Sequence, residues 1–177
     1  CVIHNAFHGG VQVCGNNNIV EYCTVYDCSM YNSDKRIKDG NSAGISIRGI
    51  PSTYAYADHN ILRHSIIHDV WGETVSAVYT QRTILEDNLV YQGGIYICNS
   101  QHGLYQRNLV YISEDMGEFK HTGIGCADEY PGNTNSDNTI INNICYGAWS
   151  NFFTNSLINC VIANNTFVNS RYDWGVV

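Results

Sequence analysis

The chain has 177 residues, of which 14% are charged, and its formal net charge at pH 7 is −7. This length suits a single domain, and the negative charge argues against nucleic acid as a partner. No segment reaches the run of about 18 apolar residues that a membrane-spanning helix needs, so the sequence predicts no membrane span.

A short motif recurs along the chain with a period of about 20 residues, which is typical of solenoid folds. It reads apolar, polar, any residue, a small polar residue, any residue, apolar. In chain order, its copies lie at residues 2–7, 20–25, 62–67, 84–90, 104–110, 140–145 and 161–167. We call the small polar residue the anchor, and the anchors are Asn5, Cys23, Ser65, Asn88, Asn108, Asn143 and Asn165.

Apolar residues alternate on both sides of each anchor, which predicts two short strands joined at a bend. A third strand, usually introduced by glycine, follows each copy. These Gly-led strands are expected at residues 10–14, 44–48, 77–81, 94–98, 123–126 and 151–154. Three strands per coil indicate a triangular parallel β-solenoid with coils about 4.8 Å apart.

The anchor asparagines suit a bend because asparagine tolerates the left-handed conformation. Their amides, turned inward, would form an asparagine ladder along the axis, with Asn88 stacked on Asn108. The register also predicts one inward apolar column, made of Phe7, Val25, Ile67, Val90, Val110, Cys145 and Phe167.

The register predicts a second, outward column that is nearly all aromatic. Its members are His8, Tyr26, His68, Tyr91, Tyr111, Tyr146 and Val168. Stacked rings stabilise successive coils. The alternative interpretation is a flat contact surface through which two copies of the chain form a homo-oligomer.

The repeat resembles that of the right-handed parallel β-helix superfamily, the pectate-lyase-like proteins, whose generic repeat is I-x-N-N-x-I-x-N-N-x-x-G-I-x-L. The resemblance covers nearly the whole chain and implies an all-β, right-handed parallel β-helix of about seven coils. The chain starts within one strand and stops where another Gly-led strand begins, so residues 1–177 are expected to be a single β-helix segment of a longer protein.

The resemblance implies an extracellular or cell-surface protein that binds polysaccharide, in a superfamily that includes polysaccharide lyases and glycoside hydrolases. The hallmarks of the polygalacturonase group (Asn-Thr-Asp, Asp-Asp and Gly-His-Gly) are absent from the sequence. The alternative is a non-catalytic shaft of a surface fibre, adhesin or tailspike-like protein.

The candidate binding surface is the outward side of the Gly-led strands. Tyr79 and Tyr96 are expected to stack there as platforms for sugar rings. Arg48 would pair with a uronate carboxylate. Tyr79, Tyr96, Arg48 and Gln81 are expected to form the base of the binding surface. Polar loops that connect the strands would flank it and contribute Lys120, His121, Asp128 and Glu129. The alternative is that both tyrosines only shield the strand backbone.

The sequence identifies no catalytic residue. Glycoside hydrolysis needs two carboxyl groups, which Glu73, Asp128 and Glu129 could supply. A lyase needs a base beside a cation, for which Lys120 and His121 are candidates. Neither set has a diagnostic spacing, and no motif indicates a metal, calcium included, or another cofactor.

Eight cysteines are present, an even number that suggests disulfides in an exported protein. However, Cys23, Cys126 and Cys145 fall on inward positions, where cysteine behaves as a small core residue. This pattern favours mostly free, buried thiols.

Overall fold

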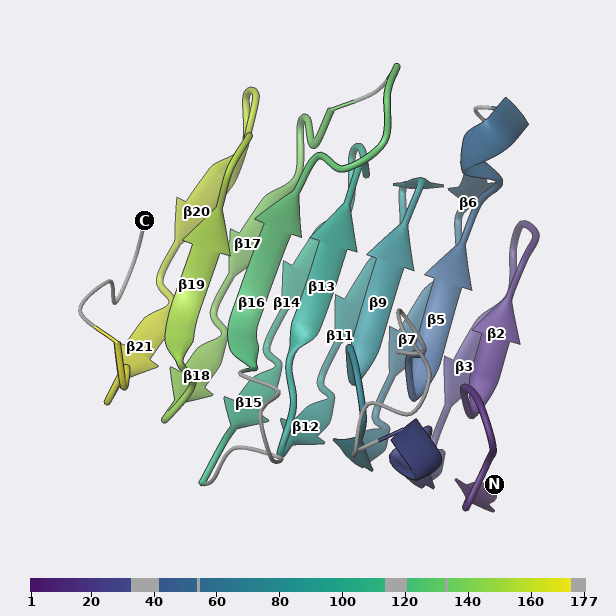
Figure 1. The fold of residues 1–177 in the computed structure, drawn as a ribbon. Helices are drawn as coiled ribbons and strands as arrows, with labels where there is room; N and C mark the ends of the chain where they lie inside the picture. The colour runs from purple at the N-terminus through teal and green to yellow at the C-terminus, as the bar shows by residue number, and fades with distance from the viewer. Residues whose placement is uncertain (33–41, 54, 114–120, 133, 173–177) are drawn as a thin grey trace.

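The computed structural model describes residues 1–32, 42–53, 55–113, 121–132 and 134–172, and these residues are mainly short parallel strands (Figure 1). The strands form three long sheets and one short pair. The two helices among the described residues are single 3-10 turns, η1 (Met30–Asn32) and η2 (Pro51–Thr53). None of the described helices is long and apolar enough to cross a membrane.

The strand bounds follow the repeat. The sheet that we call the aromatic sheet contains β1 (Val2–His4), β4 (Thr24–Cys28), β8 (Ile66–Val70), β12 (Leu89–Tyr91), β15 (Leu109–Tyr111), β18 (Ile144–Tyr146) and β21 (Thr166–Val168). The second sheet contains β3 (Ile19–Glu21), β7 (Ile61–Arg63), β11 (Ile84–Glu86), β14 (Leu104–Gln106), β17 (Thr139–Ile141) and β20 (Val161–Ala163). The Gly-led sheet contains β2 (Val11–Val13), β5 (Ile45–Arg48), β9 (Val75–Val78), β13 (Ile95–Cys98), β16 (Thr122–Ala127) and β19 (Ser150–Thr154). The short pair is β6 (Ala57–Asp58) with β10 (Thr80–Gln81).

The chain visits the three sheets in turn, so each strand pairs with its equivalent in the next coil rather than with its neighbour in sequence. All strand pairings in the named sheets are parallel, as in β12 and β15, where Val90 lies opposite Val110. Figure 1 shows the Gly-led strands side by side from β2 to β19. The predicted all-β parallel solenoid is confirmed. Its right-handed turn and the count of about seven coils stay predictions.

The apolar core lies inside the three sheets, and the predicted inward column is confirmed from Val25 to Phe167. Val25, Ile67, Val90, Val110 and Cys145 are opposite one another in successive coils and have no exposed surface. Phe167 continues the column and is partly buried. Burial of apolar side chains, of which this column is one part, is the dominant favourable term in folding.

The prediction for the first coil was wrong. Ile3, not Phe7, lies opposite Val25, and Phe7 is 64% exposed with its ring 3.9 Å from that of Tyr31. The cause is that β1 pairs with a strand that follows an anchor, whereas residues 2–4 were assigned to the strand that precedes one. The anchor of the first coil is therefore Cys1 rather than Asn5.

The bend also lies one residue earlier than predicted. The left-handed residues are those immediately before the anchors, such as Asp87 at φ 55° and Arg107 at φ 54°. Asn88 and Asn108 are buried. The Asn88 Nδ2 donates to Asn108 Oδ1 at 3.0 Å, and the same 3.0 Å bond joins Asn108 to Asn143 and Asn143 to Asn165. We call these four residues the amide column.

Outward rings stack along the aromatic sheet, with a correction at its start. His4, not His8, lies opposite Tyr26, for the same reason that Phe7 was misplaced. Ring centroids are 5.0 Å apart from His4 to Tyr26, 5.0 Å from Tyr26 to His68, and 4.2 Å from His68 to Tyr91. Tyr111 and Tyr146 continue the series at 5.4 Å. We call this series the ring stack.

Candidate functional site

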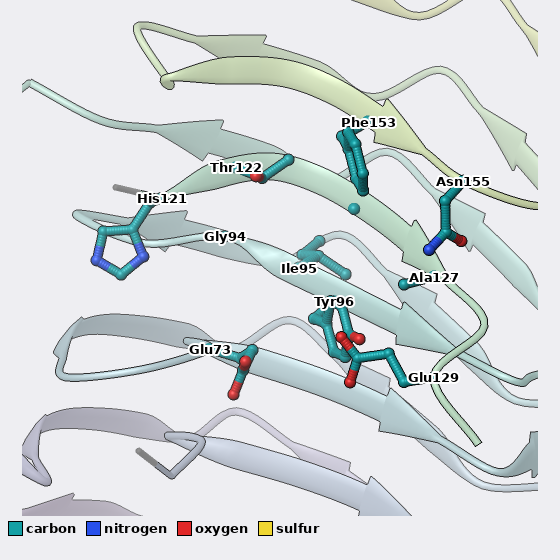
Figure 2. A pocket seen from close by; sticks show the side chains of 11 residues that line it. Glu73, Gly94, Ile95, Tyr96, His121, Thr122, Ala127, Glu129, Phe153 and Asn155 are labelled. Carbon is teal, nitrogen blue, oxygen red and sulfur yellow. The ribbon is translucent and has the colours of Figure 1, made fainter. Parts of the chain in front are cut away.

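A pocket of about 340 Å³ opens on the outer side of the Gly-led sheet, over β13, β16 and β19 (Figure 2). It is lined by Glu73, Gly94, Ile95, Tyr96, His121, Thr122, Gly125, Ala127, Glu129, Phe153 and Asn155. It lies on the sheet where the sequence predicts binding.

The hollow exists because one outward position has no side chain. Gly125 pairs with Tyr96 on one side and with Phe153 on the other. Two strand spacings of about 4.8 Å place the backbones of the two aromatic residues roughly 10 Å apart. A Cβ added to Gly125 would meet Thr122 Cγ2 at 3.6 Å and Tyr96 Cδ2 at 3.7 Å, which are ordinary van der Waals contacts, so a side chain would fit there and fill space that glycine leaves unfilled. Two aromatic side chains thus flank a gap floored by glycine.

Tyr96 is held with its hydroxyl group inside the protein. The oxygen is buried and makes no hydrogen bond of normal geometry to the described residues. Burial, together with the nearby Glu129 carboxylate and Cys98 thiol, raises the pKa of Tyr96 well above its usual value. The hydroxyl is therefore neutral at any physiological pH.

Two carboxyl groups line the same pocket from different loops. Glu73 precedes β9 and Glu129 follows β16 (Figure 2). Burial raises the pKa of Glu73, and the negative charge of Glu129 raises it further, whereas a backbone hydrogen bond and the positive charge of Arg48 oppose the shift. Ionising Glu73 is thus harder than ionising a free glutamate.

Glu129 is positioned by a buried amide. Asn99 Oδ1 accepts from the backbone N–H groups of Glu129 and Tyr130, both at 3.1 Å, and its Nδ2 donates to the Tyr130 carbonyl at 2.9 Å. Asp128 also serves this loop, because its Oδ1 accepts from the Asn135 N–H at 2.7 Å. Asp128 is not one of the residues that line the pocket. Its hydrogen bond instead fixes the shape of the loop after β16.

The predicted stack of Tyr79 on Tyr96 is wrong. Tyr79 has no exposed surface, and its hydroxyl donates to the Pro131 carbonyl at 2.6 Å. Strand β9 starts at Val75 rather than at residue 77, so Ser76 is the residue opposite Tyr96. Tyr79 comes after the strand, in the left-handed conformation at φ 51°. Through its hydrogen bond to Pro131, it holds the loop that follows β16.

The other predicted site residues are dispersed. Of the eight, Tyr96, His121 and Glu129 line the pocket. Arg48 is exposed and lines a separate pocket of about 430 Å³ with Pro51, Ser52, Tyr130 and Pro131. Gln81 lies in β10, opposite Asp58. Lys120 lies outside the described residues.

Sequence reasoning left Glu73, Gly125, Phe153 and Asn155 out of the predicted site. Glu73 was named only as one of three carboxyl groups that a glycoside hydrolase could use. The missing signal was the contrast between neighbouring coils, since a glycine replaces the aromatic residue found one strand away on each side. Sequence inspection finds that contrast only once the register is known.

Within the described residues, no group of three or more His, Cys, Asp or Glu side chains is arranged to hold a metal ion. Comparisons of the chain with protein families, with curated proteins and with solved structures found no match. The functional argument therefore rests on the geometry of the pocket.

Proposed function

We propose that this segment is a polysaccharide-binding β-helix of an extracellular or cell-surface protein, related to the right-handed parallel β-helix superfamily. The observation that supports the proposal is the Gly125 gap between Tyr96 and Phe153. Aromatic side chains offer apolar faces to the C–H groups of a sugar ring, and polar groups at the rim fix its hydroxyls. The pocket volume is at the lower end of small-ligand sites, which span roughly 300–1,000 Å³.

The charge of the lining favours a neutral sugar. Glu73 and Glu129 contribute two carboxyl groups, and the described lining residues include no lysine or arginine. A uronate would bring a third carboxyl group into this site, and repulsion between like charges would oppose its binding. Arg48, the expected uronate partner, lines the other pocket. The proposed ligand is therefore a neutral polysaccharide, and a uronan is a competing outcome of the test.

Calorimetric titration with neutral and uronate oligosaccharides tests this function. We expect the chain to bind at least one neutral oligosaccharide, and Tyr96→Ala/Phe153→Ala to weaken that binding by more than about tenfold, or about 1.4 kcal/mol. Tyr111→Ala, which removes a ring from the ring stack, is the matched control and should leave affinity unchanged. Equal affinity of the double variant and the wild type would place the site elsewhere.

Bound sugar also allows a test of catalysis. Glycoside hydrolysis requires two carboxyl groups, one of which acts as an acid with a raised pKa, and burial raises the pKa of Glu73. In a hydrolase version of this proposal, Glu73 donates a proton to the leaving oxygen and Glu129 acts as base or nucleophile. New reducing ends that disappear in both Glu73→Gln and Glu129→Gln would support it. Binding without new reducing ends would leave a binding module.

A structural shaft is the second candidate, and the amide column favours it. The first three amides of the column each donate to the next, and all four donate to a backbone carbonyl, as Asn108 Nδ2 does to Leu85 O at 2.9 Å. We propose that the column acts as an asparagine ladder that stiffens the solenoid. A folded chain that binds none of the sugars tested, and whose ladder variants lose stability, would support the shaft.

A further inference from the structure

The first two anchor positions in the sequence are both cysteines. With the corrected register, Cys1 and Cys23 occupy the position that Asn88 and Asn108 hold in later coils. Strands β1 and β4 begin directly after them, with Val2 opposite Thr24. The Thr24 N–H donates to the Cys1 carbonyl at 2.9 Å, so the two backbones are already paired at this point.

The two sulfur atoms are in contact. Cys1 Sγ and Cys23 Sγ are 3.1 Å apart, which leaves about 1 Å to close before the S–S length of about 2.05 Å. Paired residues on neighbouring strands are about 4.8–5 Å apart, within the roughly 4.4–6.8 Å Cα separation of natural disulfides. Side-chain rotation can therefore close the bond without moving either strand far.

The other cysteines differ from this pair. Burial raises the pKa of Cys28, Cys98, Cys126 and Cys145, reaching about 12 for Cys145, so these thiols are poor nucleophiles. Cys14 is exposed, and its Sγ accepts a hydrogen bond from Gln12 Nε2 at 2.9 Å. Cys1 and Cys23, in contrast, have their sulfur atoms in contact, so that when a reagent attacks one thiol the second stands ready to resolve the product.

We propose that Cys1 and Cys23 are a redox site that forms a disulfide and links the first two coils. A small-molecule disulfide such as oxidised glutathione supplies the oxidant. The Cys1 thiolate attacks one of its sulfur atoms and releases one glutathione thiolate. The Cys23 thiol, losing its proton, then displaces the second glutathione. Two thiols are oxidised and one glutathione disulfide is reduced to two thiols.

The link would replace a contact that is weak in the reduced chain. In later coils the anchors are joined by amide hydrogen bonds. Ser65 Oγ still accepts the Cys23 N–H at 3.2 Å, but the side chains of Cys1 and Cys23 meet only through their sulfur atoms. Oxidation therefore strengthens the link between β1 and β4, and reduction loosens it, without altering the pocket on β13, β16 and β19.

Mass spectrometry of the chain equilibrated in glutathione buffers of increasing oxidation tests the proposal. We expect a mass decrease of about 2 Da, the two thiol hydrogens, and a proteolytic cross-link containing Cys1 and Cys23. The oxidised chain should also unfold several degrees higher than the reduced chain. Cys23→Ser should abolish the cross-link and still fold, because serine occupies the same position in the next coil at Ser65.

Cys14→Ser is the matched control and should leave the cross-link intact. Stable glutathione adducts on Cys1 without the 2 Da loss would overturn the proposal, since they would show that Cys23 cannot resolve the intermediate. A cross-link from Cys1 to Cys14 would overturn it equally. Circular dichroism of Cys23→Ser distinguishes a missing cross-link from a missing fold.

Discussion

The aromatic sheet and the Gly-led sheet both carry outward aromatic residues, but at different spacings and with opposite results. On the aromatic sheet, rings occupy successive coils and stack, as His68 does on Tyr91 at 4.2 Å. On the Gly-led sheet, Gly125 separates Tyr96 from Phe153, and a pocket lies between them. The absence of a side chain at Gly125 therefore distinguishes the two surfaces. On the aromatic sheet the rings pack on one another, whereas on the Gly-led sheet they leave the pocket that we propose as a binding site.

The comparison also separates stability from binding. Rings in contact along a solenoid stabilise adjacent coils by about 0.5–1.5 kcal/mol per pair. Rings held apart give up that gain and leave apolar surface accessible, with polar groups at its rim. A repeat protein can thus create a site without changing its scaffold, by leaving one outward position empty.

The largest expected effect concerns the core beneath both sheets. Val90 has no exposed surface and lies between Ile67 and Val110. Val90→Asp would bury a charge among apolar neighbours, and we expect the chain not to fold. Leu109→Asp, on a residue that is 41% exposed, is the control and should fold. Circular dichroism and urea titration check both. A cooperative unfolding transition in Val90→Asp would contradict the register.

The next effect concerns the amide column. Asn108→Leu removes hydrogen bonds to Leu85, Asn88 and Asn143. We expect the free energy of unfolding to fall by about 1–3 kcal/mol, because buried backbone and amide groups lose partners. Urea denaturation measures the change. An unchanged midpoint would show that the column adds nothing to stability, and sugar affinity should be the same in both chains.

How far the sequence predicted these features depends on the kind of information that each needs. The Ile67, Val90 and Val110 column followed from alternation, because burial demands apolar residues at fixed spacing. Asn5 was wrongly taken as the first anchor. Residues 2–4 fit both the strand that precedes an anchor and the strand that follows one, so the sequence alone did not point to Cys1. Tyr79 was misplaced because the register of β9 lies three residues earlier than predicted, with Ser76 opposite Tyr96, and an odd shift reverses which side of the sheet a side chain faces. The pocket needed registers of three strands at once, which no single repeat contains.

The pH dependence of stability should show the contribution of Glu73. Its folded pKa is raised above its ordinary value of 4.5 by burial and by Glu129. Below pH 4.5 the group is protonated in both states. Between 4.5 and the raised pKa only the unfolded chain loses the proton, so stability falls as pH rises through that interval. Glu73→Gln should remove this fall from a series of thermal melts. Parallel pH curves for the two chains would contradict the assignment.

The smallest expected effect lies in the ring stack. Tyr111→Ala removes a ring 5.4 Å from that of Tyr146, and should lower the free energy of unfolding by about 0.5–1.5 kcal/mol. Thermal unfolding checks the loss. A stability unchanged from wild type would mean that the rings line up without stabilising the coils.

The affinity of Gly125→Ala for a neutral oligosaccharide tests the central claim most directly. The added methyl group fits the strand, with its nearest heavy atom at 3.6 Å, yet it stands in the gap between Tyr96 and Phe153. Gly15→Ala is the matched control, because its Cβ also meets its nearest heavy atom at 3.6 Å and the residue lies outside the pocket lining. The account predicts at least about a tenfold loss of affinity for Gly125→Ala alone, with both variants folded. Wild-type affinity in Gly125→Ala would contradict it.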